Sequence, residues 1–212
     1  MRIEEATLQQ LGHWRTALGS GAVRVGWKIG FNLPAIQERL GLDRPAIGHL
    51  TSATLIGPAA THSLAGAENP LVEPEIAIEV GPDRSIAAVS AAIEVVDMPA
   101  LPGPDEVGEA VAGNIFHRAF ALGRSHSLEE LEGADAELTV NGESRGRANA
   151  GAYDLQPMLD VAADTLEEAE ESLERGDRII AGTLTPPAPV NAGDRVAVEI
   201  GPLGRIEIEF TN

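Results

Sequence analysis

The chain has 212 residues, no cysteine, and 15 Lys and Arg residues against 33 Asp and Glu residues, which gives a formal net charge of −18 at pH 7. This length allows one domain with a substantial core, and the lack of cysteine excludes disulfides, zinc–thiolate sites and cysteine nucleophiles. The negative charge disfavours nucleic acids and anionic membranes as partners, because both would be repelled.

The sequence carries no targeting or membrane-spanning pattern. Its first ten residues, MRIEEATLQQ, are acidic and lack the basic-then-apolar order of a signal peptide. No apolar run approaches the roughly 18 residues that a membrane span needs. We therefore expect a cytoplasmic protein organised as a single domain over residues 1–212.

The first predicted elements alternate between helix and strand. A short amphipathic helix is expected within residues 1–22, ended by a Gly-Ser-Gly sequence. Residues 23–30 predict a strand, and residues 34–41 predict a helix with proline in its first turn and glycine at its end. Turn residues and short apolar pieces follow in 47–71. The next β-branched runs predict strands at 71–80, 86–97 and 115–122, with a Pro/Gly-rich loop at 99–104.

The second half is also rich in predicted strands. Asn141-Gly142 lies between two short runs and indicates a β-hairpin, while residues 155–173 show helical periodicity. Residues 178–182, 195–200 and 205–210 predict three closing strands. Because only a minority of residues is helical and no linker interrupts the chain, the pattern favours one β-rich α+β domain.

Three carboxylates in this strand-rich region suggest a metal site. Glu73 and Glu75 lie two apart in one predicted strand, and Glu94 lies in the next. Residues two apart on a strand project to the same face, roughly 6.6 Å from each other at about 3.3 Å per residue. An all-oxygen set of this kind suits a hard divalent cation such as Mg²⁺ or Mn²⁺.

A solvated acidic strand face is the alternative interpretation. Glu79 lies on the same alternation as Glu73 and Glu75, and half-exposed strands commonly carry several acids. Pro74, between the two proposed ligands, cannot donate to a strand ladder and so predicts an edge or a bulge at this point.

Several segments follow one another in an order that resembles a known family. They are GWKIG with its following helix, the Glu-x-Glu strand, AAIEVVD, and GDRIIAGTLTPPAPVNAGD. From about residue 24 to 210 the chain resembles the 2-keto-4-pentenoate hydratase / 4-oxalocrotonate decarboxylase branch of the fumarylacetoacetate hydrolase superfamily. The resemblance implies a C-terminal-like mixed β-roll or barrel with a few flanking helices, and a homo-oligomer.

The resemblance also implies an activity and a site. Members of this branch act on small anionic 2-oxo or 2-hydroxydienoic acids in aromatic catabolism, with Mg²⁺ or Mn²⁺ held by three acids, here Glu73, Glu75 and Glu94. Lys28 in GWKIG corresponds to the active-site lysine, which neutralises the substrate carboxylate or handles a proton. Taken without the resemblance, Lys28 is better explained as a surface lysine on an edge strand.

One segment departs from the family pattern. The usual Asp-Asn-Ala-Ser reads Gly113-Asn114-Ile115-Phe116 here, so that only Asn114 is retained. Asn114, Phe116, Thr183 and His49 are the expected substrate-binding residues. The expected function is a metal-dependent hydratase or lyase. The lost acid and hydroxyl leave two alternatives open: a decarboxylase of a vinylogous 2-oxo diacid, or a degenerate member that acts as a scaffold.

Two further residues near these segments have competing interpretations. His117 could carry protons, although a lone histidine is more often a packing residue. Arg118 could pair with a distal substrate carboxylate, and a simple ion pair is the alternative. Trp14 and Trp27 are expected in the core or at an interface.

Overall fold

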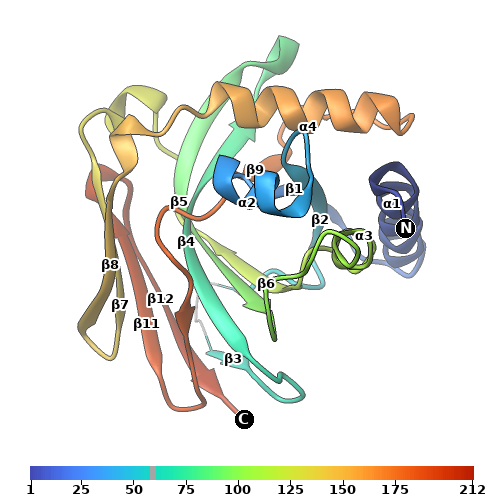
Figure 1. The fold of residues 1–212 in the computed structure, drawn as a ribbon. Coiled ribbons are helices and arrows are strands. Elements are labelled where there is room, and N and C mark those ends of the chain that lie inside the picture. Colours follow the sequence, from blue (N-terminus) through green and yellow to red (C-terminus); the bar gives the residue numbers. More distant parts are fainter. Residues whose placement is uncertain (58–60) are drawn as a thin grey trace.

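The computed structural model describes residues 1–57 and 61–212 and shows two β-sheets flanked by helices (Figure 1). The larger sheet has the strand order β2-β1-β9-β4-β5-β6, and β10 pairs with β4 outside this path. Its strands are β1 (Arg24–Gly30), β2 (Ala46–Thr51), β4 (Pro70–Val80), β5 (Ile86–Asp97), β6 (His117–Leu122), β9 (Arg178–Ile180) and β10 (Ala188–Pro189).

The smaller sheet has the order β3-β12-β11-β7-β8 and faces the long, bent strands β4 and β5 (Figure 1). Its strands are β3 (Thr61–Ser63), β7 (Asp135–Val140), β8 (Glu143–Asn149), β11 (Arg195–Ile200) and β12 (Gly204–Thr211). The hairpin predicted at Asn141-Gly142 is confirmed: both residues have positive φ, 53° and 80°, as a mirror-image turn requires.

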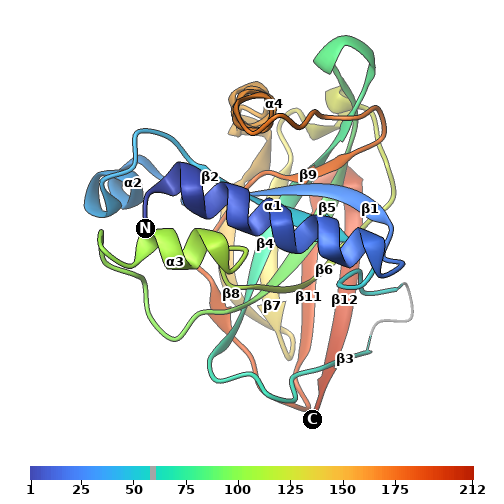
Figure 2. The same ribbon diagram turned by 90° about the vertical axis from the view of Figure 1, so that its right-hand side faces the viewer.

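Four α-helices cover the larger sheet within the described ranges: α1 (Ile3–Gly19), α2 (Pro34–Leu40), α3 (Val107–Ala112) and α4 (Gln156–Glu168). Figure 2 shows α1 beside α3 on one flank, where both contact β2, while α4 crosses above β1. This strand-rich mixture with a curled main sheet confirms the predicted fold class.

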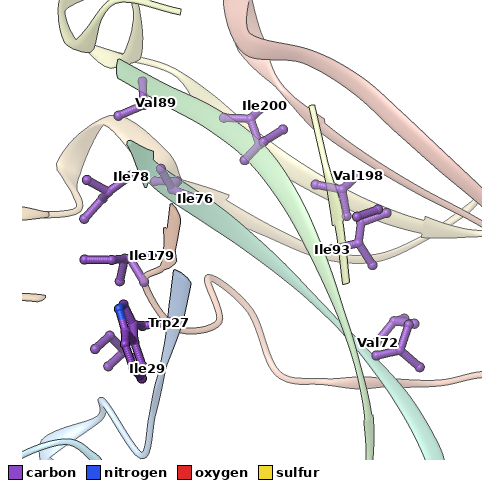
Figure 3. Close-up of a cluster of buried hydrophobic side chains, with 14 of the residues drawn as sticks. Trp27, Ile29, Val72, Ile76, Ile78, Val89, Ile93, Ile179, Val198 and Ile200 are labelled. Atoms are coloured by element: carbon purple, nitrogen blue, oxygen red, sulfur yellow. The ribbon is translucent and has the colours of Figure 1, made fainter. Parts of the chain in front are cut away.

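Side-chain alternation divides the larger sheet into two faces. On β4 and β5, the alternate residues Val72, Ile76, Ile78, Val89 and Ile93 share one face of the sheet and are fully buried (Figure 3). They pack with β1 and β9 on one side and with β11 on the other. Because this one core draws residues from both sheets, it supports the single domain that we propose for the chain.

Some predicted boundaries were wrong for local reasons. The helix expected over 155–173 ends at Glu168, and Glu170 has a φ of 58°, which no continuing α-helix permits. The strand expected from residue 115 begins at His117 because the preceding residues form a tight turn. β2, α3 and β10 were not predicted: each is short, and β2 contains a glycine and a histidine in place of a β-branched run.

The edge or bulge predicted at Pro74 was wrong. β4 is an inner strand, its pairing with β5 is continuous at Pro74 opposite Ile93, and the register shift lies between Glu79 and Val80. On its other side β4 pairs with β10 and then with β9, and Pro74 falls in the gap between them. The Pro74 carbonyl accepts from the Leu184 backbone there (2.8 Å), so the missing N–H interrupts no ladder.

In the described part of the chain, no helix is both long and apolar enough to cross a membrane. The cytoplasmic location and the homo-oligomeric state stay predictions.

Candidate metal centre and active site

Glu73, Glu75 and Glu94 converge on the face of the larger sheet opposite the core. Glu73 and Glu75 are the odd-numbered residues between the buried even positions of β4, and Glu94 is the direct cross-strand partner of Glu73. Each of the three offers a carboxylate oxygen within 4.8 Å of the others. The alternation read from the sequence therefore leads to a real cluster, whereas Glu79 on the same face pairs with Arg178 at 2.7 Å.

The environment of these acids fits a divalent cation. Burial and the neighbouring Glu94 raise the pKa of Glu73 to about 7 and the pKa of Glu75 well above its ordinary value. Glu75 Oε1 and Glu94 Oε2 are buried without a hydrogen-bond partner, although such oxygens are normally satisfied. An ion bound here would occupy both oxygens and remove the repulsion, and an all-carboxylate set selects a hard cation.

Lys28 lies on the same face and reaches the cluster because the sheet is curled. In the strand order, β9 and β4 lie between β1 and β5. In a flat sheet, the distance between β1 and β5 would therefore be about 14 Å. Yet Lys28 Nζ forms a buried ion pair with Glu94 Oε1 and donates to the Ile115 carbonyl at 3.1 Å. Burial raises the pKa of Glu94, but Lys28 and His117 more than offset this effect, so its pKa lies below the ordinary value.

The glycines around Lys28 leave space that neighbouring residues of the protein fill. A Cβ on Gly26 would lie 2.0 Å from the Arg178 carbonyl oxygen, and one on Gly30 would lie 2.8 Å from the Ile115 side chain. Opposite Lys28, a Cβ on Gly48 would lie 2.8 Å from the lysine Cγ. These glycines thus permit the close packing that buries the ammonium group.

An apolar pocket opens onto Lys28 and Glu73. Of the expected substrate-binding residues, Phe116 and Thr183 line it, and so does Asn32, which the sequence did not single out. The other lining residues are Ile29, Gly30, Phe31, Leu33, Ile36, Val96, Met98, Leu101, Ile115 and Pro187. Several of them come from the Pro/Gly-rich loop after β5 and from the start of α2.

Asn114 and His49 do not line this pocket. Asn114 Oδ1 accepts from the His49 backbone N–H (2.7 Å) and its Nδ2 donates to the His49 carbonyl (3.0 Å), so the side chain joins the 113–116 segment to β2. Burial, His117 and His13 lower the pKa of His49 to about 4, which leaves its ring neutral at pH 7. The structure gives both residues packing contacts outside the lining of this pocket.

The 114–116 segment is a left-handed turn. Asn114, Ile115 and Phe116 have φ values of 65°, 52° and 62°, which are unfavourable for residues with a Cβ, above all for a β-branched isoleucine. The turn aims the Ile115 carbonyl at Lys28 and places Phe116 in the pocket wall. Such strain is typical of functional segments, and no sequence pattern revealed it.

His117 contacts Glu94, one of the three clustered carboxylates. Its Nδ1 lies 2.7 Å from Glu94 Oε1, and its Nε2 lies 3.0 Å from Thr54 Oγ1. Burial lowers the pKa of His117, so a neutral ring donates from Nδ1 to the carboxylate. This places the histidine in contact with a proposed metal ligand and away from the pocket lining.

Metal binding is expected to stabilise the protein more at pH 8 than at pH 5. In the ion-free protein, the folded-state pKa of Glu73 is raised from 4.5 to about 7. The stability that this carboxyl group contributes is therefore fully present below pH 4.5 and is lost as the pH rises through 7. This loss is on the order of 3 kcal/mol. A bound cation removes it, because it favours the deprotonated carboxylate.

Melting temperatures measured from pH 5 to 8, with Mg²⁺ or with EDTA, test this expectation. In the Glu73→Gln variant, which cannot titrate at this position, the ion-free protein should lose less stability over the same range. A stabilisation by Mg²⁺ that is equal or larger at pH 5 would contradict the assignment.

Comparisons with known proteins agree with this geometry. The family described as fumarylacetoacetate (FAA) hydrolase C-terminal matches residues 30–211. The chain belongs to the FAA hydrolase family. This confirms the resemblance on which the sequence interpretation depended, and Lys28 lies just before the matched range.

The relatives within the FAA hydrolase family belong to the expected branch. The chain is 31% identical to the 2-keto-4-pentenoate hydratase of Burkholderia vietnamiensis over 204 residues, covering 88% of this chain and 78% of the relative. It is 29% identical, over 230 aligned residue positions, to the 2-hydroxyhexa-2,4-dienoate hydratase of Comamonas testosteroni. This match covers 100% of this chain and 87% of the relative. The fold matches that of 4-oxalocrotonate decarboxylase from Pseudomonas putida G7, complexed with magnesium and adipate (TM-score 0.86, 24% identity, 99% of this chain and 86% of that chain).

Lys28 also carries a compositional signal that spacing arguments missed. It is the only lysine in the chain, since the other 14 of the 15 basic residues are arginine. Arginine forms the surface ion pairs with Glu79 and Asp97, whereas the buried position beside Glu94 uses the compact ammonium group.

Proposed function

We propose that the protein is a metal-dependent hydratase, a carbon–oxygen lyase, that acts on a small 2-oxo or 2-hydroxydienoic acid. The observation that carries the proposal is the convergence of two buried carboxylates, a half-buried third and a buried lysine at an apolar pocket. The names of the hydratases at 31% and 29% identity support it. Glu73, Glu75 and Glu94 would hold Mg²⁺ or Mn²⁺.

The charges in this site suit a small organic anion. When bound, the cation supplies Lewis acidity to the substrate carboxylate and 2-oxo oxygen and stabilises the enolate charge. Three carboxylates and one divalent cation leave one negative charge, which the Lys28 ammonium group neutralises. Lys28 is thus placed to hold the substrate carboxylate or to move a proton at the enol oxygen. The apolar walls exclude bulk water and strengthen these interactions.

The pocket favours a monocarboxylate over a diacid. Among its lining residues in the described chain, Lys28 is the sole cation, and it already pairs with Glu94. Arg118, the cation considered for a distal carboxylate, instead pairs with Asp97 at 3.4 Å and donates to the Ala65 carbonyl at 3.0 Å. A second carboxylate would therefore be desolvated without a partner, which argues against decarboxylation of a 2-oxo diacid.

A substrate panel tests the proposal. With Mg²⁺ or Mn²⁺, the ultraviolet absorbance of 2-hydroxypenta-2,4-dienoate or its methyl homologue should fall as water adds, and EDTA should abolish the reaction. We expect a vinylogous 2-oxo diacid to react at least ~10²-fold more slowly, because its distal charge stays unpaired. Faster turnover of the diacid with release of carbon dioxide would establish the decarboxylase instead. Ion binding without turnover of any substrate would establish the scaffold.

A further inference from the structure

Asn32 is a neutral polar residue in an otherwise apolar part of the pocket. It follows β1, the strand that carries Lys28, and lines the same pocket as Lys28 and Glu73. The other neutral polar side chain in the lining is Thr183, whose hydroxyl donates its hydrogen to the Thr185 carbonyl at 2.6 Å. Asn32 therefore stands out as the pocket amide without an assigned role.

The orientation of the Asn32 amide follows from a hydrogen-bond chain. The Tyr153 hydroxyl donates its single hydrogen to the Ala181 carbonyl at 3.1 Å, and it accepts a hydrogen bond from Asn32. Because a phenol has one hydrogen, the asparagine atom at Tyr153 must be the donor Nδ2 and not Oδ1. Asn32 Oδ1 has no hydrogen-bond partner within the described residues, and it is left as a free acceptor.

The same hydrogen-bond chain places the Asn32 amide beside the cluster of three carboxylates. A Cβ on Gly182 would lie 2.5 Å from Asn32 Cγ, so the amide packs directly on this glycine, whose φ of 96° also favours a residue without a side chain. The Gly182 backbone N–H donates to Glu75 Oε2 at 2.7 Å. One loop thus holds both a proposed metal ligand and the acceptor.

We propose that Asn32 Oδ1 positions the water molecule that adds to the substrate, and that Tyr153 is the positioning residue that orients Asn32. The inference rests on the proposed hydratase function. It also explains how water can be ordered although Gly113 and Phe116 stand where an acid and a hydroxyl are usual in this branch. An oriented acceptor in an apolar pocket fixes one water hydrogen and directs the oxygen lone pair.

The step is a conjugate addition to 2-oxopent-3-enoate, the keto tautomer that 2-hydroxypenta-2,4-dienoate gives when its 2-hydroxyl loses a proton and carbon 5 gains one. The water oxygen forms a bond to carbon 4, the electron pair of the C3=C4 double bond becomes the C2=C3 double bond, and the π pair of the 2-oxo group moves onto its oxygen, which gives an enolate. The water loses one proton, and carbon 3 gains one as the 2-oxo group is restored. The net result is one water added across C3=C4, with no oxidant or reductant required.

Two reactions separate this role from a role at the metal site. Hydration of 2-hydroxypenta-2,4-dienoate needs the positioned water, whereas deuterium exchange at carbon 3 of 2-oxopentanoate needs enolisation alone. We expect Asn32→Leu to lower the hydration rate ~10²-fold while exchange stays within about threefold of the original protein. Tyr153→Phe should lower hydration about tenfold, and the double variant should be no worse than Asn32→Leu. Asn212→Leu, at the exposed terminus, is the control.

A binding measurement supplies a readout without turnover. The 4-hydroxyl of 4-hydroxy-2-oxopentanoate lies where the added water was, so the original protein should bind it several-fold more tightly than 2-oxopentanoate in calorimetry, and Asn32→Leu should lose this difference. Unchanged hydration in Asn32→Leu, or an equal loss of hydration and exchange, would overturn the role of Asn32. Absence of metal-dependent hydration in the original protein would instead overturn the proposed function and this inference with it.

Discussion

Replacing Glu75 with glutamine is expected to lower metal-dependent turnover by at least ~10³-fold and to weaken the binding of Mg²⁺ strongly. The change keeps the shape of the side chain and an oxygen for the Gly182 N–H, but it removes the negative charge that Glu75 can offer to a cation at a fully buried position with one unsatisfied oxygen. Steady-state kinetics and calorimetric titration with Mg²⁺ measure the two effects. The matched control is Glu79→Gln, on the same strand face, whose side chain pairs with Arg178.

The stability of the Glu75→Gln variant distinguishes loss of the site from loss of the fold. Burial and the neighbouring acids raise the pKa of Glu75 well above its ordinary value, so a neutral amide suits the ion-free protein at least as well as the carboxyl group. The melting temperature in EDTA should therefore not fall. Normal Mg²⁺ affinity in Glu75→Gln, or an equal loss of activity in Glu79→Gln, would contradict the assignment of Glu75 as a ligand.

Strand periodicity, together with the family resemblance, brought the three acids together in prediction. The spacing of Glu73 and Glu75 places both on one face, and the run around Glu94 forms the adjacent antiparallel strand in a register that pairs Glu94 with Glu73. The core confirms the same alternation, because Val72 and Ile76, on the opposite face of β4, are buried in the core. Local pattern thus determines most of this half of the site.

The rest of the site depends on tertiary geometry that no local pattern encodes. Lys28 meets Glu94 because the sheet is curled, and curling reflects the twist and packing of whole strands. In the left-handed turn at 114–116 only Asn114 is a residue typical of turns, whereas Ile115 and Phe116 favour a strand, so the local pattern does not predict the positive φ of all three. Asn32 and Tyr153 are 121 residues apart, and only the assembled loop brings them into contact.

Replacing Lys28 with methionine is expected to lower turnover by ~10² to 10³-fold without loss of metal binding. Methionine fills a similar volume, but it leaves the negative charge of Glu94 buried with His117 as its remaining side-chain partner. Breaking a buried pair in this way destabilises a protein by about 3–5 kcal/mol. The ion-free variant should therefore melt well below the original protein, and Mg²⁺ should restore much of the difference because the cation compensates Glu94.

Lys28→Arg separates charge from shape at this position. Arginine keeps the positive charge, but the lysine stem already packs where a Cβ on Gly48 would lie 2.8 Å away, and the broader guanidinium group has no space in a position that is 2% exposed. We expect Lys28→Arg to be as inactive as Lys28→Met, with turnover of the 2-hydroxydienoate as the measurement. If arginine restored activity, any buried cation would suffice at this position. If the methionine variant turned over normally, Lys28 would only stabilise Glu94, and the substrate carboxylate would have to be neutralised by the bound cation alone.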